Sequence, residues 1–323
     1  MDVLFSNFIN NFTKNSLFEA VAILLWALLL CFLASLMSFV FFQLTKMLQK
    51  FVLSNLNNVK EFDEKRKQIP SSILYILFLT MTFVPFILIF SLIPYSKGFI
   101  ILNSNLSSLI ALTFLLLAFA SSLFLPLFTF DTKKTDCIKN TFKGLLFFIP
   151  LNFSVLSVIV QSSSFNLNDI VVSQVFDKGF SNWFLLNNLF GFLAFLFSAL
   201  FIFKFIETNK TNAWNEYFDN LFLSLITLFG VTLFLGGYLA PFDFYLANLF
   251  DLGFQLTTFL IFVEQFVWLV LKFVLLEFCL IFLYNKLRKY DFSIKKTTLI
   301  LSGVSITNFV VISILKYFST GSF

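Results

Sequence analysis

The chain has 323 residues, of which 59% are hydrophobic and only 12% are charged, with 22 basic and 17 acidic side chains. Soluble domains have roughly a quarter of their residues charged, so this chain has too little polar surface to face water, and its solvent must be lipid. The composition therefore excludes a soluble globular enzyme. We expect a single polytopic membrane domain over residues 1–323.

Residue usage narrows the chemistry further. The sequence has no His, and its three Cys (Cys31, Cys137, Cys279) are far apart, which excludes a His-based triad, a His-bound metal, a CxxC site and a disulfide framework. It has 53 Phe, and only Arg66 and Arg288 among its 22 basic residues are Arg. This bias is typical of AT-rich coding and favours an organellar gene or a reduced bacterial genome.

Eight apolar runs are long enough to cross a membrane, which requires about 20 residues each. They lie near 17–43, 71–94, 105–130, 142–162, 183–206, 218–240, 255–284 and 297–316. The runs are continuously apolar rather than alternating, and open sheet edges cannot face lipid, so they predict helices. The fold class is therefore an all-α integral membrane protein with about eight transmembrane helices, of which the long seventh is expected to tilt.

The charges in the predicted loops indicate an orientation. The loops after the odd-numbered runs hold Lys46, Lys50, Lys60, Lys65, Arg66, Lys67, Lys133, Lys134, Lys139, Lys143, Lys204, Lys210, Lys286, Arg288, Lys289, Lys295 and Lys296. The opposite loops hold only Lys97 and Lys178. By the positive-inside rule the odd loops face the cytoplasm or matrix, and both termini lie on the outer, intermembrane-space side.

The first odd loop is the longest polar segment, from Gln43 to Ile69. Its first part, Leu44–Val52, has apolar residues at helical spacing and a basic face, which is compatible with an interfacial helix. Its second part, Lys60–Lys67, mixes both signs of charge and is expected to be a solvated loop.

The seventh run contains three ionisable side chains, Glu264, Lys272 and Glu277. Charges inside lipid are expensive and mark functional or pairing sites. Glu264 and Lys272 are eight residues apart and so lie on neighbouring faces without direct contact, and partners on other helices are expected. Two interpretations remain open: a proton relay near a quinone, or structural pairing within a bundle of subunits.

Three carboxylates gather between the fifth and sixth runs. Glu207 ends one run, and Glu216 and Asp219 begin the next, beside Lys204 and Lys210. Carboxylates clustered at a membrane face can have raised pKa values through desolvation and mutual repulsion, which suits proton uptake. The alternative is an ordinary short polar turn between two helices.

Several short segments of the chain follow one another in an order that resembles a known family. They are Ile69-Pro70-Ser71-Ser72, Glu207-Thr208-Asn209-Lys210-Thr211, Asn215-Glu216-Tyr217 with Asn220, Thr232-Leu233-Phe234-Leu235-Gly236-Gly237-Tyr238, Leu271-Lys272, Arg288-Lys289-Tyr290-Asp291 and Asn308. Together they resemble the family of membrane subunit 1 of NADH:ubiquinone oxidoreductase (respiratory complex I), which is encoded in mitochondrial genomes and has a bacterial counterpart. The resemblance extends over most of the chain from residue 68 onward.

The resemblance implies a membrane component of a proton-translocating NADH:ubiquinone reductase, at the heel of its membrane arm, that forms part of the quinone tunnel and proton path. No cofactor would bind this chain directly: ubiquinone is the substrate, and flavin and iron–sulfur clusters belong to partner subunits. Partners would be other membrane-arm and peripheral-arm subunits, lipids and quinone, not nucleic acid, in the mitochondrial inner membrane. Proton-path candidates are Glu207, Glu216, Asp219, Glu264, Lys272 and Glu277; quinone-side or arm-contact candidates are Asn209, Lys210, Tyr217, Arg288 and Asp291.

The sequence also departs from the family. The long acidic stretch that lines the quinone chamber between the fifth and sixth helices is missing between Glu207 and Glu216. Pro150-Leu151 stands where the family has a Glu, and Lys210 replaces an Arg, which loses its bidentate fork. Two alternatives follow: a structural subunit of a respiratory complex with a degenerate quinone site, or an unrelated multi-span transporter.

Overall fold

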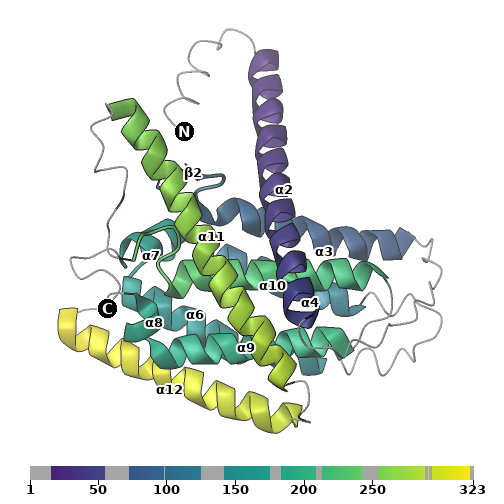
Figure 1. Ribbon diagram of the computed structural model, residues 1–323, viewed down its shortest axis with the longest axis vertical. Coiled ribbons are helices and arrows are strands. Elements are labelled where there is room, and N and C mark those ends of the chain that lie inside the picture. The colour runs from purple at the N-terminus through teal and green to yellow at the C-terminus, as the bar shows by residue number, and fades with distance from the viewer. Residues whose placement is uncertain are drawn as a thin grey trace.

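The computed structural model of the chain describes residues 16–54, 73–97, 99–124, 142–174, 183–208, 213–241, 245, 254–287, 290 and 293–320. The described helices are α2 (Ser16–Ser54), α3 (Ile73–Leu92), α4 (Ser107–Phe124), α6 (Phe148–Ser162), α7 (Leu167–Val172), α8 (Phe184–Asn187), α9 (Leu189–Thr208), α10 (Ala213–Phe234), α11 (Phe254–Leu287) and α12 (Ile294–Thr320) (Figure 1). Two short strands, β1 (Pro94–Ser96) and β2 (Phe99–Ile100), pair in antiparallel fashion after α3.

Each of the eight predicted apolar runs coincides with a helix, so the helical fold class is confirmed for the described residues. Four of these helices are long and apolar enough to cross a membrane: Phe32–Phe51, Phe142–Ser162, Leu256–Leu287 and Lys296–Ser319. The other apolar helices are shorter, at Thr80–Leu92, Ser107–Leu123, Leu189–Phe205 and Asn220–Phe234. That the chain crosses the membrane eight times therefore stays a prediction.

The first helix corrects the expectation of a separate interfacial helix. α2 has 39 residues and continues without a break from the apolar run through Leu44–Val52 to Ser54. The segment contains neither Gly nor Pro, so nothing in it interrupts the helical hydrogen bonds. At about 1.5 Å per residue α2 is roughly 58 Å long, well beyond the hydrocarbon thickness of about 30 Å.

The fifth predicted run is interrupted near its start. It begins with the short helix α8 and restarts as α9 after Asn188, whose backbone has left the helical region with φ −136 and ψ 47. The Asn188 side chain accepts a hydrogen bond from the backbone N–H of Gly191 at 3.2 Å. This is the geometry of an Asn N-cap, which begins a new helix.

Two elements between the runs were not predicted. The β1–β2 hairpin follows α3, and its Lys97 backbone N–H donates to the Gln265 side chain of α11 at 2.8 Å. The helix α7 follows α6, with Asn166 as its N-cap. Neither has enough apolar periodicity for detection in the sequence.

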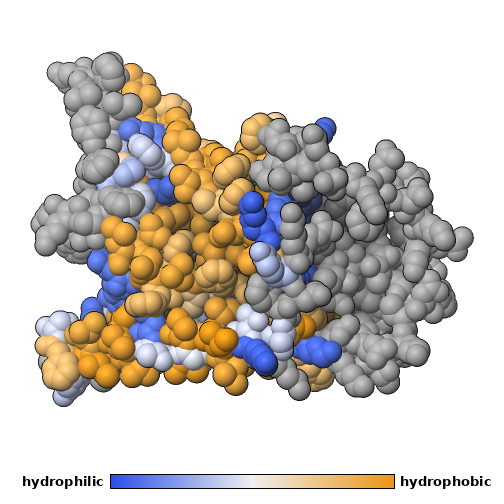
Figure 2. All heavy atoms as spheres, turned by 60° about the horizontal axis from the view of Figure 1, so that its bottom comes forward, coloured by the Kyte–Doolittle hydropathy of each residue, from blue (hydrophilic) through white to orange (hydrophobic). Residues whose placement is uncertain are grey.

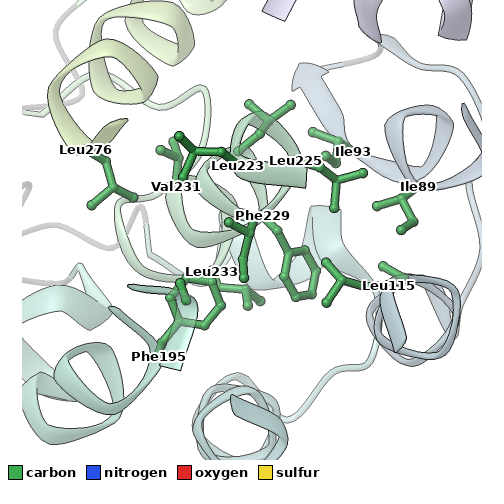
Figure 3. Packing of buried hydrophobic residues seen from close by; sticks show 14 of the residues in the cluster. Ile89, Ile93, Leu115, Phe195, Leu223, Leu225, Phe229, Val231, Leu233 and Leu276 are labelled. Atoms are coloured by element: carbon green, nitrogen blue, oxygen red, sulfur yellow. The ribbon is translucent and has the colours of Figure 1, made fainter. Parts of the chain in front are cut away.

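The centre of the bundle is α10. All residues from Asn220 through Ala240 are buried, and α10 packs against α2, α3, α6, α9 and α11. Around Phe229 the close-up shows aliphatic and aromatic side chains from several helices, including Ile89, Leu115, Phe195 and Leu276 (Figure 3). The sixth run is therefore hydrophobic on every face because it has protein neighbours on every face.

The outer surface is apolar over wide areas, as Figure 2 shows in orange. On α12, Leu299, Leu315 and Phe318 are 75%, 63% and 79% exposed. Exposed patches of this extent are rare on soluble monomers. They are what lipid or neighbouring subunits would cover, in agreement with the composition.

The helices α2 and α11 cross the bundle steeply relative to the others (Figure 1). They contact each other through Phe41 and Phe273, whose ring centroids are 4.7 Å apart. One turn further along each helix, Thr45 lies beside Glu277. Because both residue numbers increase together along the contact, α2 and α11 run in the same direction.

Candidate functional site

The candidate site is built on α11, which carries Glu264, Lys272 and Glu277. Lys272 is 7% exposed and Glu277 is 0% exposed, whereas Glu264 is half-buried. A lysine this deep does not extend its ammonium to a membrane surface. The structure therefore brings two of the three predicted residues into the protein interior.

The ammonium of Lys272 is held by backbone carbonyls rather than by an acid. Its Nζ donates to the carbonyl oxygens of Leu235 at 2.7 Å, Gly237 at 2.9 Å and Leu239 at 2.5 Å. The three N–H groups of the ammonium are thereby all used. Nζ also lies 4.2 Å from the centroid of the Trp183 ring, in a cation–π contact.

These carbonyls converge because α10 ends at Phe234, earlier than the predicted run to residue 240. Gly236 and Gly237 have φ of 68° and 48°, a left-handed conformation that glycine adopts without steric penalty. The Gly237 N–H bonds back to the Val231 carbonyl at 3.0 Å, which also accepts from the Leu235 N–H, so the segment folds back onto the last turn of the helix. The chain then turns, and its carbonyls point at α11.

A second side chain completes this helix end. Gln174 is 1% exposed, and its Nε2 donates to the carbonyls of Thr232 and Leu233 at 3.4 and 3.2 Å. Its Oε1 accepts from the backbone N–H of Phe184 at 3.2 Å. The negative end of the α10 dipole thus meets one amide and one ammonium, which is the favourable polarity for a cation.

A buried tyrosine adjoins the same turn. Tyr238 is 1% exposed, and its hydroxyl donates to the Asn168 side chain of α7 at 3.2 Å. A buried tyrosine hydroxyl needs such a partner, since an unpaired one would lose its hydrogen bonds to water without replacement. Tyr238 therefore ties the turn after α10 to α7.

Glu277 has a different environment. Among the residues that the structure describes, neither of its carboxyl oxygens has a hydrogen-bond partner, and the polar side chain beside it is Thr45 of α2. Lys272, by contrast, has its hydrogen-bond partners outside α11, in the backbone oxygens that follow the end of α10.

The remaining predicted residues belong to the end of α9, the start of α10 or stretches outside the described residues. The backbones of Glu207, Glu216 and Asp219 belong to the last turn of α9 and the start of α10, but their side chains and that of Tyr217 are outside the described set, as are Asn209, Lys210, Arg288 and Asp291. A contact links the end of α9 to the segment after α11, because Lys204 Nζ donates to the Tyr290 carbonyl at 2.7 Å.

The residues that sequence reasoning missed are Gln174, Trp183 and Thr45. Each has an ordinary sequence context, and only the tertiary arrangement gives it a role. The one signal available was the Gly236-Gly237 pair at the end of an apolar run, which marks a helix end. Within the described residues, no group of three or more Cys, Asp and Glu side chains is placed to hold a metal ion.

Comparison with known proteins identifies the fold. No model of a known protein family matches this chain. Among solved structures, a chain of the membrane-bound sulfane sulfur reductase (MBS), an archaeal respiratory membrane complex, is similar with a TM-score of 0.65. The match covers 91% of this chain and 99% of that one at 16% sequence identity. This chain therefore has the fold of a component of a respiratory membrane complex.

Proposed function

We propose that this chain is a membrane-arm subunit of a proton-pumping NADH:ubiquinone oxidoreductase, forming the heel of the arm and part of the quinone tunnel and proton path. It contributes no redox centre of its own. In this proposal ubiquinone is the substrate of the complex, and flavin and iron–sulfur clusters are bound by partner subunits. The location proposed is an energy-transducing membrane, specifically the mitochondrial inner membrane if the coding bias reflects an organellar gene.

One observation carries the proposal: two segments of the family resemblance, distant in sequence, meet in the structure. The Lys272 ammonium of the Leu271-Lys272 segment binds the carbonyls of Leu235 and Gly237, which belong to the Leu-Phe-Leu-Gly-Gly segment. Chance matches in a Phe- and Leu-rich chain would have no reason to form contacts with one another.

The similar archaeal chain gives independent support. Its fold covers nearly the whole of both chains, and it belongs to a respiratory complex named for sulfane sulfur reduction rather than quinone reduction. Both the archaeal structure and the sequence resemblance thus support a membrane-arm subunit of a respiratory complex. The quinone-specific part of the proposal rests on the sequence resemblance alone.

A second candidate function is a structural membrane subunit whose quinone site has degenerated. One observation favours it: α9 ends at Thr208 and α10 begins at Ala213, so only residues 209–212 connect them. That connection is too short for the acidic loop of the resembled family. The proton-path roles of Glu207, Glu216 and Asp219 depend on which candidate is correct.

Native-gel separation of gently solubilised membranes, with mass spectrometry of the co-migrating chains, tests the proposal. We expect co-migration with flavin- and iron–sulfur-containing NADH-oxidising subunits. Migration alone or in an unrelated assembly would contradict the proposal and favour a transporter. A photoreactive ubiquinone analogue then separates the two candidates: labelling of this chain supports a quinone tunnel, and labelling of neighbouring subunits only supports the structural role.

A further inference from the structure

Glu277 is too deeply buried to be an ionised carboxylate without a compensating cation. It is 0% exposed, and within the described part of the chain both carboxyl oxygens lack a hydrogen-bond partner. Burying an ionised carboxylate costs several kcal/mol even after relaxation, unless a cation and hydrogen bonds compensate. A neutral carboxylic acid avoids most of this cost.

The neighbouring hydroxyl indicates which form Glu277 takes. Thr45 of α2, itself 0% exposed, lies beside Glu277 and donates its hydroxyl hydrogen to the Phe41 carbonyl at 3.0 Å. A threonine hydroxyl has one hydrogen and two lone pairs. While that hydrogen stays on the Phe41 carbonyl, the Thr45 hydroxyl offers Glu277 only lone pairs, and only a protonated carboxyl has a hydrogen to donate to them.

The nearest base on the same helix does not neutralise Glu277. Lys272 lies five residues earlier, about 140° around the helix axis, and its ammonium is fully engaged by three carbonyls. A partner subunit docking on the outside does not reach a side chain that is 0% exposed in this chain. Lys272 therefore does not supply Glu277 with a compensating positive charge.

Further polar atoms without partners follow Glu277 toward the C-terminal end of α11. Tyr284 is seven residues further, on the same helix face and about 10 Å along the axis. Among described residues its hydroxyl and the Asn285 Nδ2 are buried with no hydrogen-bond partner. Buried polar atoms of this kind are where structural water binds. They lie between Glu277 and the C-terminal end of α11.

We propose that Glu277 is a protonated carboxylic acid that donates to the Thr45 hydroxyl, and that it releases and regains this proton through water on its Tyr284 side during turnover. One O–H bond of the carboxyl breaks as a water molecule takes the proton, and the same bond forms again when a proton returns. No electrons move. The exchange step deepens the proton path proposed above and rests on it, whereas the protonated state of Glu277 does not.

Infrared difference spectroscopy of the purified assembly, in H₂O and D₂O, tests the protonated state. We expect a carbonyl band of a protonated carboxyl that shifts on deuteration and is absent in Glu277→Gln, whose amide has the same shape. Thr45→Val should move that band by removing its acceptor, and the matched Thr45→Ser, which retains the hydroxyl, should leave it in place. A spectrum in which Glu277→Gln removes only carboxylate bands overturns the inference.

Proton movement tests the exchange step. In sealed vesicles, Glu277→Gln is expected to lose proton translocation per electron transferred, and Glu277→Asp should restore part of it. Unchanged translocation in Glu277→Gln overturns the exchange step. Native gels test the subunit assignment, and the infrared and vesicle experiments test the role of Glu277. A failure of either one is therefore distinguishable from a failure of the other.

Discussion

At the scale of single residues, Lys272 shows how a buried charge is held without an opposite charge. Its three N–H groups each donate to a carbonyl at the end of α10, where the helix dipole is negative. The arrangement combines ordinary hydrogen bonds with a favourable local field. Lys272 is thus held by backbone carbonyls rather than by an acidic side chain.

Replacing this lysine should destabilise the fold. Lys272→Leu leaves three carbonyls of the Leu235–Leu239 turn without a donor, and each unsatisfied buried group costs about 1–3 kcal/mol, reduced where water enters. We expect a clearly lower thermal unfolding temperature of the solubilised protein and less assembled complex on native gels. Lys286→Leu, an exposed lysine on the same helix, is the matched control and should change neither. Equal behaviour of the two variants would contradict this role.

At the scale of elements, the helices are joined by polar contacts where close packing alone would not fix their positions. Asn188, at the junction of α8 and α9, donates to the Ser157 hydroxyl of α6 at 2.8 Å and accepts from Asn308 of α12 at 2.8 Å. In lipid no hydrophobic force distinguishes a protein neighbour from an acyl chain, so such hydrogen bonds select the partner helix.

The Asn188 junction predicts a coupled effect on α12. Asn188→Leu removes three hydrogen bonds, those to Ser157, Asn308 and Gly191, each worth roughly 0.6 kcal/mol in a membrane protein, so the free energy of unfolding should fall by about 2 kcal/mol. Asn187→Leu, the exposed neighbour, should have little effect.

A double-mutant cycle identifies the contact itself. Asn308→Leu combined with Asn188→Leu should destabilise by less than the sum of the two single changes, because both remove the same hydrogen bond. Strict additivity of the two free energies, measured by unfolding in mixed micelles, would show that the helices are not coupled through this pair.

At the scale of the whole molecule, helix ends that are far apart in the sequence lie together. α2 and α11 run in the same direction. Lys204, near the C-terminal end of α9, donates to the Tyr290 carbonyl beyond the end of α11. The ends of the fifth and seventh helices therefore lie together, where the basic residues are concentrated. Lys97, in the turn of the β1–β2 hairpin, is tied to the early part of α11 through Gln265.

Cysteine labelling in sealed vesicles checks the orientation expected from the loop charges. In a background lacking Cys31, Cys137 and Cys279, we expect Lys97→Cys and Lys286→Cys to react with a membrane-impermeant maleimide from opposite sides. Both positions are exposed in the structure, so accessibility does not limit the reaction. Labelling of both from the same side would show that the number of crossings between them is even rather than odd.

Much of the fold could be predicted from the sequence because lipid imposes a simple requirement. Each segment facing hydrocarbon must be apolar and must satisfy its own backbone hydrogen bonds, so helix positions and fold class follow from hydropathy alone. The exact ends did not follow: α10 ends at Phe234 because Gly236 and Gly237 adopt positive φ, and α9 begins after Asn188 because its side chain caps a new helix.

The candidate site was only partly predictable. Charge within an apolar run was enough to single out Lys272 and Glu277, since any ionisable group in lipid requires a reason. Their partners were not predictable, because Gln174, Trp183, Thr45 and the Leu235–Leu239 carbonyls approach α11 from distant parts of the sequence. By itself the sequence determined that this protein belongs in a membrane and which helices it builds. Only the tertiary structure decided that the Lys272 ammonium is held by a helix end while the Glu277 carboxyl faces the Thr45 hydroxyl, because hydrogen-bond partners depend on which helices pack together.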